Sequence, residues 1–260
     1  MAATDVGWAG LAASLVLIAL ALGLSFAQQL KLEREIVWAS ARAAAQLLLV
    51  GVALVAVLDQ ETPVAVSWAW VVAMVLFAAM TVRARARGVP GIFGISLVAM
   101  SAITAVSLGV IFGLGIFPVE PEAIVPLAGM MIGNAMAQTV LAANRVVADI
   151  HGRRDEVEAR LALGQPAQVA SRPYVADALR TALIPQIERT KAVGIVILPG
   201  AMTGLILAGV DPADAVRVQL AVMYLILGSV ATSATIIGIG VRRRLFTPDH
   251  RLVHLPRAAD

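Results

Sequence analysis

Three side chains that could line a transport path follow one another at four-residue spacing in an apolar stretch. They are Met130, Asn134 and Gln138. Residues four apart share one face of an α-helix, so a thioether and two amides would form a single row. An amide inside a membrane needs a polar partner or a water-filled path. The row predicts a path lining. The alternative is that both amides make only interhelical hydrogen bonds and that the methionine serves packing.

Glycines near this row and in a later apolar stretch predict close packing of helices. Gly129 and Gly133 are four residues apart on the face beside the row, and Gly200 and Gly204 repeat that spacing just after a proline. Small residues at this spacing let two membrane helices approach closely. We therefore expect these four positions to be helix contacts.

The residues that the chain lacks argue against a tight metal site, an ATP-binding site and an enzyme active site. The chain has no cysteine, and its three histidines lie in hydrophilic segments. A tight transition-metal site is therefore not expected, although a weakly bound ion or a complexed metal would fit, and the metal ligands stay unknown. No phosphate-binding Gly-x-x-x-x-Gly-Lys-Ser/Thr sequence occurs, so any ATP and Mg²⁺ would belong to another chain. No paired carboxylates or nucleophile–base pair point to an enzyme.

The elements that would position these residues are membrane helices. Of the 260 residues, 60% are hydrophobic and only 14% are charged. Long runs without charge, each sufficient for the roughly 20 helical residues that cross a bilayer, predict an all-α integral membrane protein. One run is interrupted only by an arginine, Arg42. The seven predicted crossings are residues 6–30, 36–58, 62–82, 88–119, 123–144, 192–210 and 218–241.

The distribution of basic residues predicts the orientation of these crossings. If the N-terminus is outside, all but Arg217 of the 20 lysines and arginines fall on or near the inner side. The outer connections then carry the acidic residues Asp59, Glu61, Glu120, Glu122, Asp211 and Asp214. Cytoplasmic segments are enriched in lysine and arginine, so we expect an outside N-terminus and a cytoplasmic C-terminus in a bacterial inner (plasma) membrane.

One hydrophilic segment, residues 145–191, is long enough to have a function separate from crossing the membrane. Residues 153–163 predict a short helix with acidic residues in its early turns, where the helix dipole favours them. Gly164 is expected to close this helix and Pro166 to restart the chain. A second helix is expected to run on toward Pro185. The segment is too small to be an enzymatic domain, so residues 1–260 are read as one transmembrane domain.

The first of these cytoplasmic helices resembles the EAA loop of ABC-transporter permeases. The run Glu158-Ala159-Arg160-Leu161-Ala162-Leu163-Gly164 matches its Glu-Ala-Ala-x-x-x-Gly pattern, except that Arg160 replaces the second alanine. In those permeases the loop forms a coupling helix that sits in a groove of a separate ATPase subunit. The resemblance therefore implies that Glu158, Ala159, Leu163, Gly164 and Pro166 contact an ATPase.

Nearly the whole chain is similar to the UPF0014 family of permeases. The matching runs are Gly129-Met130-Met131-Ile132-Gly133-Asn134-Ala135-Met136, Ala182-Leu183-Ile184-Pro185, Leu198-Pro199-Gly200-Ala201-Met202-Thr203-Gly204-Leu205-Ile206 and Ala208-Gly209-Val210-Asp211-Pro212. The resemblance implies a permease subunit, in a homodimer, that pairs with a separate ATPase. For cargo it implies export linked to iron or metal homeostasis.

Two classes of transporter fit these features. An ABC permease would need an ATPase partner, whereas an ion-coupled secondary transporter would act alone. A secondary transporter normally carries an aspartate or glutamate inside the membrane as a proton relay. No acidic residue falls inside the predicted crossings, which favours the permease. Neither class involves nucleic acid; the partners are the bilayer, the ATPase and a second copy.

Overall fold

The computed structural model describes residues 8–59, 62–86, 88–195 and 197–253, and the secondary structure there is helical apart from two isolated bridges. The chain divides into two compact units, Met1–Thr62 and Pro63–Asp260. Each unit has its own internal packing.

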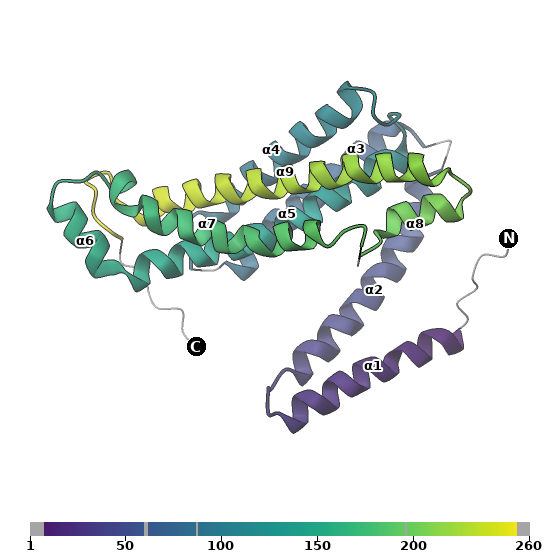
Figure 1. Cartoon of the computed structure of the whole chain (residues 1–260), viewed down its shortest axis with the longest axis horizontal. Coiled ribbons are helices and arrows are strands. Elements are labelled where there is room, and N and C mark those ends of the chain that lie inside the picture. Colours follow the sequence, from purple (N-terminus) through teal and green to yellow (C-terminus); the bar gives the residue numbers. More distant parts are fainter. Residues whose placement is uncertain (1–7, 60–61, 87, 196, 254–260) are drawn as a thin grey trace. The chain divides into compact units, whose positions relative to one another are not determined.

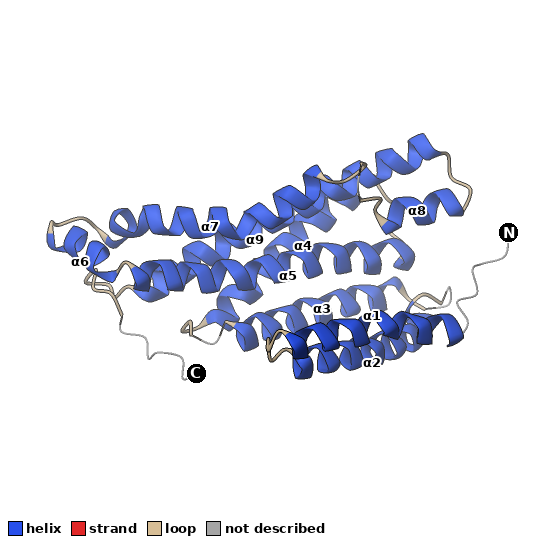
Figure 2. Cartoon of the chain, turned by 60° about the horizontal axis from the view of Figure 1, so that its bottom comes forward, coloured by secondary structure: helices blue, strands red, loops and turns tan. Residues whose placement is uncertain are grey.

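The first unit is a pair of helices joined by a tight turn. Helices α1 (Trp8–Ala27) and α2 (Glu33–Val57) diverge from this turn (Figure 1), and both are helical over their whole length (Figure 2). The buried Ser25 hydroxyl donates to Glu33 Oε1 at 2.7 Å and accepts from the Leu32 amide at 3.3 Å. Gln29 and Lys31 take left-handed backbone conformations, with φ of 53° and 58°, which non-glycine residues rarely adopt. The serine therefore ties together a turn whose backbone is strained.

The second unit is built on four long helices. They are α3 (Val64–Arg85), α4 (Ile92–Gly113), α5 (Pro121–Gly152) and α9 (Pro212–Leu245). Proline stands at the first position of both α5 and α9, where its missing N–H costs nothing. Asp211 caps α9, accepting from the Ala213 amide at 2.8 Å. Two buried apolar clusters fill the bundle, one at each end.

Three shorter or more polar helices complete this unit. Helix α6 (Arg154–Ala162) lies at the end of the bundle where α5 finishes (Figure 1). Helix α7 (Ala167–Lys191) packs along α5 and α9 through a stripe of small side chains that includes Ala170, Ala178 and Ala182. Helix α8 (Gly200–Leu207) then packs on the other end of α9, so α7 and α8 follow one another along that helix (Figure 1).

Most predicted crossings are confirmed as helices. Five described helices are long and apolar enough to span a membrane: α2, α3, α4, α5 and α9. The predicted crossing over residues 6–30 corresponds to α1, which has 20 residues and no charged side chain. Helix α5 continues eight residues past the predicted end at residue 144, to Gly152. The chain is therefore an all-helical membrane protein in its described part.

The predicted helix over residues 192–210 is wrong as a continuous crossing. The backbone at Gly194 is left-handed, with φ of 91°, and an isolated bridge joins Val193 to Ile197. Pro199 then marks the start of α8, which has only eight residues, or about 12 Å of helix. Apolar composition alone cannot distinguish a helix from such a turn, whereas the glycine and proline can.

Candidate functional site

Helix α6 ends in a turn that depends on Gly164. The amide of Gly164 donates to the Leu161 carbonyl at 2.9 Å, and the amide of Gln165 donates to the Arg160 carbonyl at 3.1 Å. This pair of bonds is the Schellman motif, which needs a left-handed residue between helix and exit. Gly164 has φ of 84°. Pro166 follows as the residue before α7. The predicted end of the first helix at Gly164 and the predicted start of the second after Pro166 are thus confirmed, whereas the second helix continues past Pro185 to Lys191.

Side chains on α7 hold α6 in a fixed position. Val157 is completely buried, and the Tyr174 hydroxyl donates to Glu156 Oε2 at 2.9 Å. The guanidinium carbons of Arg153 and Arg160 lie 5.5 and 5.8 Å from the centre of the Tyr174 ring. Guanidinium groups at this distance are attracted to an aromatic face. Helix α6 is therefore bound to the bundle at several points and would move with it.

The turn between α6 and α7, with the adjoining residues 158–169, forms a corner of the molecule. The side of this α6 corner that faces away from the bundle is exposed. Leu163 is 82% exposed, and Val169 at the start of α7 is 50% exposed. Ala159, Gly164 and Pro166 are exposed as well. Glu158 is also exposed and is held by Arg154 Nε at 2.6 Å. The five residues predicted to contact an ATPase therefore lie together at one exposed corner, with a leucine at its tip.

A contact from the C-terminal segment was missed by sequence reasoning. The amide of Ala167, at the first position of α7, donates to His250 Nδ1 at 3.3 Å. A bridge between Phe246 and Leu252 folds this segment back. Three consecutive arginines at the end of α9 line a cavity of about 530 Å³ beside it. The contact spans 83 residues of sequence, so no local pattern could have revealed it.

Replacing Gly164 with alanine is expected to destabilise this corner. A side chain at φ of 84° costs about 1–2 kcal/mol, because Cβ crowds the following carbonyl. Thermal unfolding in detergent should show a lower midpoint for Gly164→Ala. The matched control is Gly152→Ala, where a Cβ would meet no atom within 4 Å and the backbone has no left-handed φ. Equal midpoints for the two variants would contradict the role of the turn.

Replacing Tyr174 with phenylalanine is expected to remove one hydrogen bond, worth about 1 kcal/mol, while keeping the ring. Burial, followed by the bond to Glu156, raises the pKa of Tyr174 above its ordinary value of 10.0. The folded protein therefore favours the protonated hydroxyl. This contribution to stability is complete at pH values below the ordinary pKa and is lost as the pH rises through the raised pKa of the folded protein. Unfolding midpoints between neutral and alkaline pH would show this loss in the parent and less of it in Tyr174→Phe. The control is Tyr224→Phe, at an exposed tyrosine of α9.

The predicted path row lies on α5, partly exposed between its packed faces. Asn134 Nδ2 donates to the Met130 carbonyl of its own helix at 2.7 Å. Gln138 Oε1 is shielded and has no hydrogen-bond partner within the described residues. Neither amide bonds to another helix among those residues, so the predicted interhelical bonds are not found there. A role of the row in transport stays a prediction.

Of the four glycines predicted to be helix contacts, only Gly129 lies near a described side chain of another helix. A Cβ at Gly129 would lie 3.7 Å from Met74 Cε on α3. At Gly133, Gly200 and Gly204 a Cβ would meet no described atom within 4 Å. The close approaches are at Gly238 and Gly240 on α9. A Cβ at Gly238 would lie 2.8 Å from Leu179 Cδ2 on α7, and one at Gly240 would overlap Ile95 on α4.

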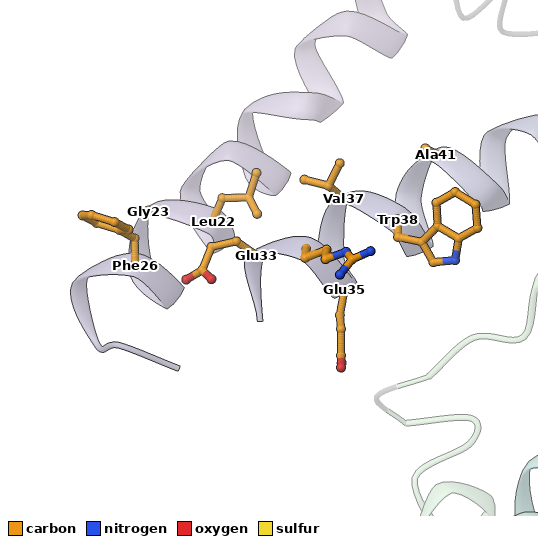
Figure 3. A pocket seen from close by; sticks show the side chains of 9 residues that line it. Leu22, Gly23, Phe26, Glu33, Glu35, Val37, Trp38 and Ala41 are labelled. Carbon is orange, nitrogen blue, oxygen red and sulfur yellow. The ribbon is translucent and has the colours of Figure 1, made fainter. Parts of the chain in front are cut away.

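The first unit has a cavity of its own, of about 1120 Å³. Leu22 and Phe26 of α1 and Val37 and Trp38 of α2 line it, with Glu33 at the turn (Figure 3). The Glu33 carboxylate is already engaged by Ser25. Within the described residues no three His, Cys, Asp or Glu side chains gather as a metal site. This cavity contains none of the predicted site residues.

The fold and this corner together define a class, a multi-pass helical membrane protein with an exposed helix between two bundle helices. Residues 8–246 match the family described as "Uncharacterised protein family (UPF0014)", and the chain belongs to that family. No solved structure matches the chain.

Named relatives match most of this chain. The "UPF0014 membrane protein STAR2" of rice is 38% identical over 226 residues, covering 85% of this chain and 78% of the rice protein. The "Probable iron export permease protein FetB" of Escherichia coli is 32% identical over 247 residues, covering 94% and 93%. "Protein ALUMINUM SENSITIVE 3" of Arabidopsis thaliana is 36% identical over 230 residues, covering 86% and 81%. The family resemblance predicted from sequence is therefore confirmed.

Proposed function

We propose that the chain is the membrane subunit of an ATP-driven transporter and that α6 couples it to a separate ATPase. The observation that supports this most strongly is the exposed corner around Leu163. Helix α6 is anchored by buried Val157 and by Tyr174, yet its tip is apolar and exposed. An exposed apolar tip on a rigidly held helix suits a groove in a partner protein.

Such a corner transmits motion because it is attached to two long helices at once. Helix α6 follows α5 directly and precedes α7 by four residues. When ATP and Mg²⁺ bind the partner and it closes, α6 moves as a lever and the ends of α5 and α7 move with it. Transport then follows from alternation between two arrangements of the bundle. A homodimer would present two such corners to two ATPase subunits.

The proposed cargo is a metal, exported in a complexed or weakly bound form. Support comes from the E. coli relative, which is named for iron export. The described residues hold no cluster of metal-binding side chains, so a desolvated ion held by several protein ligands is not the expected form.

The proposed topology has seven crossings in the inner membrane, with the N-terminus outside and the C-terminus in the cytoplasm. Helices α1 to α5 and α9 would supply six of them. The chain must return from α6 to the start of α9 at the opposite end of the bundle, and α7 and α8 together would supply the seventh. The basic residues at the α6 end, including Arg153, Arg154 and Arg242, support the assignment of that end to the cytoplasm.

A secondary transporter remains a second candidate because of one structural observation. Helix α7 brings Asp177 and Glu188 alongside the apolar helices, although both lie outside the crossings predicted from sequence. A carboxylate in that position is what a proton relay requires. Each is paired with a base on its own helix, Asp177 with Arg180 at 3.3 Å and Glu188 with Lys191 at 2.8 Å.

Reconstitution separates the two candidates. We expect the chain to co-purify with an ATPase that carries a phosphate-binding loop, such as one from a neighbouring reading frame, and metals or metal chelates to stimulate ATP hydrolysis by the complex. Proteoliposomes containing the chain alone should not transport under a pH gradient. Gradient-driven transport without any ATPase would overturn the proposal.

A further inference from the structure

Helices α7 and α8 follow one another along α9, with a break in the helical structure between them. Helix α7 runs antiparallel to α9 from the α6 end, and α8 continues toward the start of α9 (Figure 1). Between them the backbone leaves helical geometry at Gly194 and around the bridge between Val193 and Ile197. Non-helical backbone at membrane depth is tolerated only where protein buries it or water reaches it.

The depth of α7 follows from its contact with α9. Leu179 lies against Gly238, four residues before the basic end of α9 at Arg242. At a rise of about 1.5 Å per residue, Leu179 lies roughly 6 Å inside the level of Arg242, and Lys191 roughly 18 Å further. The hydrocarbon core of a bilayer is about 30 Å thick. If α9 spans the bilayer over its charge-free residues 218–241, the last three turns of α7 lie within hydrocarbon depth.

This part of α7 nevertheless carries an exposed polar stripe. The stripe consists of Asp177, Thr181, Ile184, Glu188 and Lys191, at the three- and four-residue spacing of one helix face. Its charged members are exposed, and the buried residues of α7 lie on another face. Ion pairs with exposed side chains do not suit a lipid-facing surface, because charge in hydrocarbon is costly.

Pro185 removes one backbone hydrogen-bond donor beside the stripe. Proline has no N–H and therefore cannot donate to the carbonyl of the residue four before it, which is Thr181. The Thr181 hydroxyl does not replace this donor, because it donates to the Asp177 carbonyl at 2.9 Å. A carbonyl without its helical donor needs water or another polar group, and the residue that carries it belongs to the stripe.

We infer that α7 and α8 are the two halves of one broken membrane crossing and that the stripe on α7 lines a water-filled path for a hydrophilic, charged solute. The inference rests on the proposed function, because that function requires a transport path. It names α7 as the helix that forms the wall of this path. The two acidic residues of the stripe, each paired with a basic residue of α7, suit a solute that keeps its water and do not suit a lipid cargo.

The chain has no cysteine, so single introduced thiols report water access without background. The variants are Ile184→Cys on the stripe and Val98→Cys on α4, an apolar residue that is also exposed on its helix. A third, Asp214→Cys, lies in the first turn of α9 beyond α8. The chain alone, in membrane vesicles of either orientation, is treated with a charged, impermeant thiol reagent.

Ile184→Cys is expected to react at least about tenfold faster than Val98→Cys from the cytoplasmic side, because a thiol must ionise in water to react. Asp214→Cys is expected to react only from the outer side. Protection of Ile184→Cys would mean that lipid or protein covers the stripe and would overturn the inference. Reaction of Asp214→Cys from the cytoplasmic side would overturn the broken crossing. Because no ATPase is present, failure of ATPase pairing would leave both results unchanged and would be seen only in co-purification.

Discussion

Replacement of Leu163 by aspartate is expected to uncouple the transporter, reducing cargo-stimulated ATP hydrolysis by at least about tenfold. The leucine is 82% exposed at the tip of the α6 corner, so the fold of the chain does not depend on this side chain. In a partner groove, however, an unpaired carboxylate would cost several kcal/mol, well above the ~1.4 kcal/mol that corresponds to tenfold. ATPase assays on the reconstituted complex measure the effect.

Two controls make this result specific to the corner. Leu163→Met keeps volume and apolar character, and should retain coupling. Membrane insertion of Leu163→Asp should equal that of the parent, because the side chain packs against little of the bundle. Glu158→Ala should uncouple to a smaller degree, since it removes a charge that Arg154 orients. Full coupling in the aspartate variant would remove α6 from the mechanism.

The second large effect is expected at Asn134. Asn134→Leu keeps side-chain size but removes the amide, so the transport rate should fall by about tenfold or more if a polar group there is worth a hydrogen bond to a charged cargo. ATPase association should survive, because Asn134 lies in the middle of α5, far along the helix from α6. Metal flux into inverted vesicles measures the rate.

The control for Asn134 comes from the same helix. Met136→Leu changes a partly buried residue that packs against both apolar clusters, and should leave flux unchanged. Gln138→Leu tests the next position of the row, whose Oε1 is shielded and unpaired within the described residues. Normal flux in Asn134→Leu would exclude this residue from the path.

The sequence predicted the α6 corner well because its signals are local. A glycine in a left-handed turn and a proline before the next helix mark the corner at Gly164 and Pro166 wherever the rest of the chain lies. The long apolar helices were also predictable, since a charge-free apolar run of about 20 residues is typical of a membrane-spanning helix. The contact between Ala167 and His250 was not, because it joins residues distant in sequence.

The clearest difference between prediction and structure concerns residues 192–210, and its cause is physical. The apolar residues 192–210 suggested a complete crossing, although Gly194 and Pro199 interrupt it. Close packing was also predicted at Gly200 and Gly204, whereas the closest approaches between described residues are at Gly238 and Gly240.

Site-specific cross-linking from α6 tests the central claim most directly. A photoreactive group attached at Leu163→Cys, in cells that produce the candidate ATPase, should yield one adduct of permease and ATPase. The same group at Val98→Cys on α4 should yield none. An adduct at both positions, or at neither while the protein is correctly inserted, would contradict the assignment of this corner as the ATPase-coupling site.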